Sequence, residues 1–217
     1  MDDTYYTPPL SKRLALKLVV EDDTTTTESL SARPWVDATL RASLDQANVV
    51  FVQWENFRDV ESPVFPTNTA ELFRYIQEEA PPSINSEVAV RDEDYHEVSL
   101  HSDLVWLPDI LIKSAAITAT TVVLPTVVNL ISEWLKKQLL ERHARADAKL
   151  QVIIESPTGG SKRIIYEGPV DGLRQITELA QRVEPTATVN PVHLPATPPV
   201  PLLLNLSSSK DNSAPIP

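Results

Sequence analysis

Alternating hydrophobic and polar residues predict several short β-strands. Between residues 14 and 20, leucines alternate with Ala15 and Lys17, which is typical of a strand with one buried face. The run NVVFVQW at 48–54 is apolar and β-branched, which indicates a buried strand. Further strands are predicted at 86–91, 95–101, 150–155 and 162–167. The first two flank an acidic turn at 92–94 and the last two flank a Pro-Thr-Gly-Gly turn at 157–160, so we expect two hairpins.

A helical pattern separates the first two predicted strands. Two aspartates and the threonines at 24–27 predict a polar loop. Beyond it, Val36, Leu40 and Leu44 recur at helical spacing behind Pro34, a residue that a first helical turn accepts. We therefore expect a strand–helix–strand unit whose parallel crossover is right-handed.

Two further amphipathic helices are predicted. One begins near Asn68, with Glu71 at the spacing of a capping box, and the prolines at 81–82 end it. The other covers residues 170–183, with its apolar residues on one side.

The longest uncharged stretch covers residues 114–132 and continues into an amphipathic helical pattern. Two interpretations stay open. The stretch is a helix buried in the core or in a partner interface, or it is a membrane span with basic residues following on one side. Pro125, Asn129 and four threonines favour the first interpretation. The residues expected to carry the interaction or the membrane contact are Val122, Val123, Leu124, Val127, Val128, Ile131, Trp134 and Leu135.

Composition and charge narrow the function classes. Hydrophobic residues make up 42% of the chain, which is ordinary for a protein that buries a core, and cysteine is absent. Disulfides and thiolate chemistry are therefore excluded. Residues 1–113 hold 21 acidic and 9 basic residues, a net charge of −12, whereas residues 114–217 have 9 and 10, a net charge of +1. The acidic half argues against nucleic-acid binding. The acidic, polar N-terminus predicts a cytoplasmic protein, associated with a membrane under the second interpretation.

The order of these patterns predicts an α+β fold with a mixed sheet packed by helices, a long apolar central helix and a disordered proline-rich tail. Eight prolines fall within the last 33 residues. The expected divisions are a flexible terminus at 1–13, an α+β sub-module at 14–104, a helix and hairpin sub-module at 105–184 and the tail at 185–217.

No catalytic, cofactor or metal site is expected. His96 and His101 have opposite strand parity and so would face opposite sides of a sheet, which disfavours a shared metal. Residues 158–162 superficially match a phosphate loop, but strands are predicted on both sides and the Ser-Lys order is reversed. No nucleophile elbow, zinc-protease motif or dinucleotide fingerprint occurs.

The second half resembles the effector-associated constant component of bacterial conflict and signalling systems. The resemblance covers roughly residues 110–183 and rests on the helix AAITATTVVLPTVVNL, the following ISEWLKK, the strands LQVIIES and KRIIYEGP, and the helix VDGLRQITELAQRV. It implies a non-catalytic adaptor in a defence or signalling system. The expected partner is an effector protein or a second copy of the chain. The alternative is a membrane-associated or pore-forming effector acting through residues 114–132.

Overall fold

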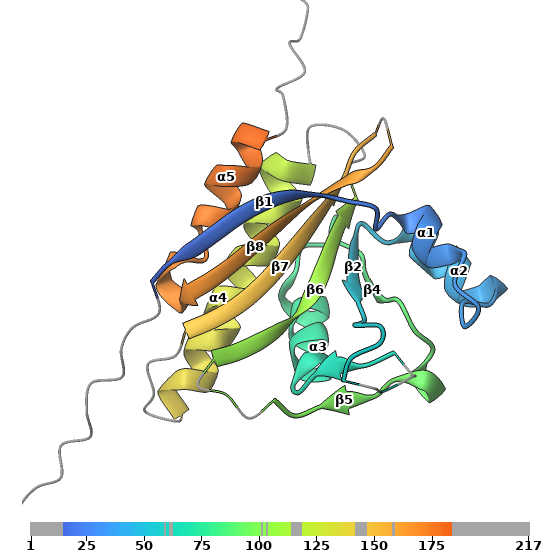
Figure 1. The fold of residues 1–217 in the computed structure, drawn as a ribbon, viewed down its shortest axis with the longest axis horizontal. Coiled ribbons are helices and arrows are strands. Elements are labelled where there is room, and N and C mark those ends of the chain that lie inside the picture. Colours follow the sequence, from blue (N-terminus) through green and yellow to red (C-terminus); the bar gives the residue numbers. More distant parts are fainter. Residues whose placement is uncertain are drawn as a thin grey trace, which may run out of the picture. The chain divides into compact units, whose positions relative to one another are not determined.

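The computed structural model describes residues 15–58, 60, 63–100, 102, 104–113, 119–141, 147–157 and 159–183. A six-stranded mixed sheet has the order β1-β8-β7-β6-β2-β4 (Figure 1). Its strands are β1 (Lys17–Asp23), β2 (Val49–Val52), β4 (Ser86–Val88), β6 (Leu104–Lys113), β7 (Asp147–Glu155) and β8 (Ser161–Pro169). Two short strands, β3 (Phe65–Pro66) and β5 (Glu97–Val98), form a separate parallel pair. The expected α+β class, a mixed sheet packed by helices, is confirmed. The predicted segments 1–13 and 185–217 lie outside the described residues.

The described residues form five α-helices. They are α1 (Thr27–Ser31), α2 (Ala38–Gln46), α3 (Thr69–Glu79), α4 (Leu124–Glu141) and α5 (Gln175–Val183). A π-helical segment, η2 (Ala119–Val123), leads into α4, and 3-10 turns occur at η1 (Asp92–Asp94) and η3 (Val170–Gly172). The β7–β8 hairpin is confirmed, with Gly159 and Gly160 at positive φ in its turn.

The predicted strand–helix–strand crossover between the first two strands is wrong. β1 pairs antiparallel with β8 at one edge of the sheet, and it begins three residues later than predicted. β2 lies four strands away in the sheet order. The parallel neighbours are β2 with β4 and β6 with β7, and these pairs are connected through α3 and α4 respectively. Local patterns therefore identified β1 and β2 but not their partners, because pairing is decided over long sequence separations.

The predicted hairpin around residues 92–94 is also wrong. β4 belongs to the main sheet, β5 pairs with β3, and η1 lies between them. The sequence analysis missed β6, which pairs with β2 on one side and β7 on the other. β6 occupies the residues at which the two sub-modules were expected to divide.

The starts of α1 and α2 are set by capping residues that the sequence patterns did not identify. The threonine-rich loop is shorter than predicted: residues 24–26 are outside any helix or strand, and α1 begins at Thr27, since Thr26 and Ser29 make a reciprocal capping box. α2 begins after Asp37, whose carboxylate accepts a hydrogen bond from the Leu40 amide at 2.8 Å. Pro34 therefore precedes this helix and is not part of it.

The start of α3 is capped from another segment. The Asn68 side chain makes no capping hydrogen bond, and the predicted pairing with Glu71 does not form at this start. Instead the Glu97 carboxylate in β5 accepts from the amides of Asn68 and Ala70, each at 2.9 Å. This contact joins the small sheet to the first turn of α3.

The two faces of the main sheet are covered differently (Figure 1). On the first face, buried residues of α3, α4 and α5 pack against alternate residues of the strands, such as Ile110 and Ile112 of β6. On the second face, Leu30 of α1 and Leu44 of α2 pack against the intervening residues, such as Leu111. The second cluster extends over β2, β6 and Ile153 of β7 and includes no residue of β1 or β8.

Candidate functional site

The structure places the predicted interaction residues mostly inside the first-face core. Seven of the eight are buried, and these are Val123, Leu124, Val127, Val128, Ile131, Trp134 and Leu135. The eighth, Val122, is 50% exposed. Among the helices of the described residues, none combines the length and the apolarity that crossing a membrane requires.

The described residues contain no group of three or more side chains placed to hold a metal ion. His96 lies just before β5, and His101 lies outside the described residues. Gly159 to Lys162, the described part of the loop resembling a phosphate site, runs from the hairpin turn into the start of β8. The expected absence of metal and nucleotide binding stays a prediction.

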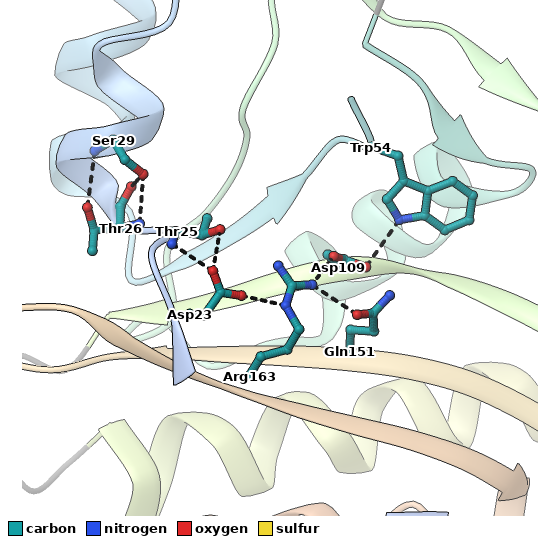
Figure 2. Close-up of polar contacts among 8 residues, drawn as sticks. All are labelled: Asp23, Thr25, Thr26, Ser29, Trp54, Asp109, Gln151 and Arg163. Atoms are coloured by element: carbon teal, nitrogen blue, oxygen red, sulfur yellow. Dashed lines mark hydrogen bonds and ion pairs between the residues drawn. The ribbon is translucent and has the colours of Figure 1, made fainter. Parts of the chain in front are cut away.

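The most organised polar cluster lies on the second face, centred on Arg163 of β8 (Figure 2). Its Nε donates to the carboxylate of Asp23 in β1, and its Nη1 donates to the carboxylate of Asp109 in β6. The same Nη1 donates to Oε1 of Gln151 in β7 at 3.0 Å. One arginine therefore connects three other strands of the sheet.

Strand alternation explains why these residues meet. Ile110 of β6, Val152 of β7 and Ile164 of β8 face the helices of the first face. Their neighbours Asp109, Gln151 and Arg163 must therefore point to the opposite face. Figure 2 shows these side chains on one side of the strands, with a helix in the colour of α4 beyond the strands.

Asp109 is the most deeply placed charged group in this cluster. It is only 5% exposed, and its second carboxylate oxygen accepts from Nε1 of Trp54 at 3.1 Å. Burial raises the pKa of Asp109, and the charge of Arg163 and the bond from Trp54 offset this only in part. Burial also opposes the charge of Arg163, but Asp109 and Asp23 outweigh it and raise the arginine pKa.

Asp23 connects the cluster to the start of α1. Its Oδ1 accepts from the Thr25 amide at 2.8 Å and from the Thr25 hydroxyl at 2.9 Å. Burial acts to raise the pKa of Asp23, but the bonds from Thr25 and the charge of Arg163 outweigh it and lower this pKa. Thr26 then caps α1, so the polar cluster lies at the junction between the end of β1 and the start of α1 (Figure 2).

A cavity of about 420 Å³ opens beside this cluster. Asp109, Gln151 and Arg163 lie at its polar end, and Leu30 and Arg33 line it from the side of α1. The volume falls within the range of about 300–1,000 Å³ that small-ligand sites occupy.

Three partly buried aromatic residues form the remaining wall. The rings of Trp54 and Trp106 meet edge to face with centroids 5.7 Å apart, and Phe57 lies 5.2 Å from Trp54. The Lys149 ammonium stands 4.4 Å from the Trp106 ring centroid. Rings with one face packed and another accessible are typical of binding surfaces.

The loop that carries Phe57 has an unusual backbone. Asn56 and Arg58, on either side of Phe57, have φ values of 53° and 48°. Residues other than glycine rarely adopt this left-handed backbone region. Each residue held in it lowers the stability of the fold by about 1 kcal/mol or more. The loop therefore holds the Phe57 ring against Trp54 at an energetic cost.

The charged groups of the cluster already have partners within the protein. Each carboxylate in the cluster is engaged by Arg163 and by a second donor, so neither is a free general base. At the rim, Arg33 and Glu55 are likewise paired with each other at 3.0 Å.

Sequence reasoning missed this site because its residues lie far apart along the chain. Arg163 and Asp109 are separated by 54 positions, and Arg163 and Asp23 by 140. One signal was present in LPDILIK, where a single acid follows Pro108 inside an apolar run. A charged residue in a buried strand requires a partner, so this run indicated a buried ion pair.

No protein-family model, curated protein or solved structure matches this chain.

Proposed function

We propose that the protein is a non-catalytic interaction module that binds a protein partner through the second-face cavity. The observation that carries the proposal is the wall formed by Trp54, Phe57 and Trp106 around that cavity. Tryptophan is enriched among the residues that dominate binding energy at protein interfaces. A short segment of the partner, with one side chain packed against these rings, fits a cavity of this size.

The proposed context is a cytoplasmic adaptor in a bacterial defence or signalling system. Support comes from the resemblance of residues 110–183 to the effector-associated constant component. The order α4, β7, β8 and α5 is the helix, two strands and helix on which that resemblance rests. The partner would be an effector or a second copy of the chain.

The membrane alternative has less support. Insertion of the stretch at 114–132 into lipid would remove Leu124, Val127 and Ile131 from the first-face core, where they are at most 1% exposed. Losing several such side chains from a core costs several kcal/mol each.

A peptide selection tests the proposal. Random peptides displayed on phage are selected against the wild-type protein, and their affinities are then measured by isothermal titration. We expect peptides with an apolar anchor, whose binding weakens at least about tenfold in Trp106→Ala. The matched control is Tyr75→Ala, because Tyr75 on α3 also has a lysine over its ring, at 4.6 Å, but lies on the other face. Failure to select any peptide, or equal loss in both variants, would contradict the proposal.

A further inference from the structure

We infer that the second-face cavity takes an uncharged group carrying a carbonyl oxygen, such as an amide, and discriminates against carboxylates. This inference rests on the proposed function and specifies its ligand chemistry. Three features of the polar end support it: the free hydrogen-bond donors, the local charge and the adjoining aromatic wall.

The polar end of the cavity offers N–H donors. Arg163 uses Nε and Nη1 for its protein contacts, and its Nη2 donates to none of the described residues. Gln151 accepts through Oε1, and its Nε2 likewise donates to none of the described residues. Both residues line the cavity. A ligand oxygen placed here would accept from an amide and a guanidinium together.

Local charge decides which kind of oxygen fits. The carboxylates of Asp23 and Asp109 both contact Arg163, so two negative charges surround one positive charge and the cluster carries −1. Arg33 and Glu55 at the rim cancel each other. A carboxylate bound at these donors would lie beside the carboxylates of Asp23 and Asp109, because both contact Arg163 directly. The cations Lys149 and Arg58 stand instead over the rings of Trp106 and Phe57, at the aromatic wall. A carbonyl oxygen brings no charge and so avoids repulsion at the polar end.

The aromatic wall sets what accompanies the carbonyl group. Trp54 belongs to both regions, because its indole N–H donates to Asp109 while its ring contacts Phe57 and Trp106. A ligand with an apolar or aromatic part next to its amide fits both ends of the cavity at once. A peptide segment with an aromatic or aliphatic side chain has this combination.

Three probes that share a phenyl ring but differ in charge test how the charge of the ligand affects binding. N-acetylphenylalaninamide is neutral, N-acetylphenylalanine is a carboxylate and phenethylamine is an ammonium ion at pH 7. Binding is followed by chemical shifts of the ¹⁵N-labelled protein, in titrations to millimolar concentration. We expect the neutral amide to bind most tightly, about tenfold better than the carboxylate, with shifts at Gln151 and Trp106.

A charge reversal in the donor set gives the second arm. Gln151→Glu keeps an oxygen for Arg163 but replaces the free donor with a carboxylate. Binding of the neutral amide should weaken about tenfold and binding of phenethylamine should strengthen. Gln77→Glu is the control, since Gln77 is an exposed residue of α3 and brings the same charge change.

The outcomes are distinct from those of the peptide selection. Tighter binding of the carboxylate, or a Gln151→Glu variant with unchanged preference, overturns the inference while the peptide-binding function stands. Binding of none of the probes also overturns it. If no peptide is selected, or if Trp106→Ala and Tyr75→Ala weaken peptide binding equally, the proposed function itself is overturned.

Discussion

The two faces of the sheet are built from the same strands but differ in chemistry. The first face is covered by α3, α4 and α5 and is packed with buried apolar side chains such as Ile110 and Leu124. The second face has an apolar cluster over β2 and β6, and next to it the Arg163 cluster and the cavity. Because the first face buries most of the apolar surface, the second face can hold charged groups without loss of the fold. Substitutions on each face test this division.

The largest effect is expected on the first face. Val127→Asp places an unpaired carboxylate where the native side chain is 1% exposed, which costs several kcal/mol and should unfold the domain. Val122→Asp, five residues earlier at a position 50% exposed, should leave the melting temperature almost unchanged. Thermal unfolding followed by circular dichroism measures both. Similar melting curves for the two variants would show that α4 does not pack as described.

The second prediction concerns the buried ion pair of the other face. Asp109→Ala leaves Arg163 with less compensation and the Trp54 N–H without its acceptor, so the free energy of unfolding should fall by about 3–5 kcal/mol. Asp171→Ala breaks an ion pair with Lys136 whose aspartate side chain is 88% exposed, and it should cost less than about 1 kcal/mol. Urea denaturation gives both values. Equal losses would mean that the second-face cluster behaves as an ordinary surface pair.

The third prediction uses pH. The pKa of Asp23 is lowered in the folded state, so its contribution to stability is complete above its unfolded value and is lost as pH falls through the folded value. Asp23→Asn should therefore be less stable than wild type by about 1–3 kcal/mol at pH 7, and this gap should shrink below about pH 4.

The control for Asp23 is its neighbour Asp22, whose side chain is 87% exposed and pairs with Lys162. Asp22→Asn should change stability at pH 7 by less than about 1 kcal/mol. A gap between wild type and Asp23→Asn that stays constant down to pH 3 would contradict the role assigned to Asp23.

The smallest effect is expected at the buried amide of Gln53. Gln53 is 4% exposed, and neither its Oε1 nor its Nε2 has a hydrogen-bond partner among the described residues. Gln53→Met preserves the shape and removes the unsatisfied groups, so it should raise the free energy of unfolding by about 1 kcal/mol. Gln151→Met is the opposite case, because the Gln151 amide accepts from Arg163, and it should lower that free energy. Chemical denaturation of both variants checks the difference in sign.

The sequence was informative where structure is local. The β7–β8 hairpin followed from two apolar runs around a glycine turn, and α3 and α5 followed from helical spacing. β6 was missed because Pro108 and Asp109 interrupt an apolar run, and both residues normally argue against a central strand. The structure tolerates them there because the register shifts between Trp106 and Asp109, and because Arg163 reaches the carboxylate. That compensation comes from another strand and leaves no mark in the local pattern.

Because β1 pairs with β8, β1 stays without its partner strand while most of the chain is synthesised. The interacting residues lie about 140 positions apart, as in the contact of Asp22 with Lys162. At a synthesis rate of about 5–20 residues per second, β1 waits roughly 7–30 s on the ribosome before its partner emerges. A strand whose backbone groups stay unpaired for that time can pair with other nascent chains. Lys17, Glu21, Asp22 and Asp23 place charge at both ends of its apolar centre, which disfavours such aggregation until the last strand closes the sheet.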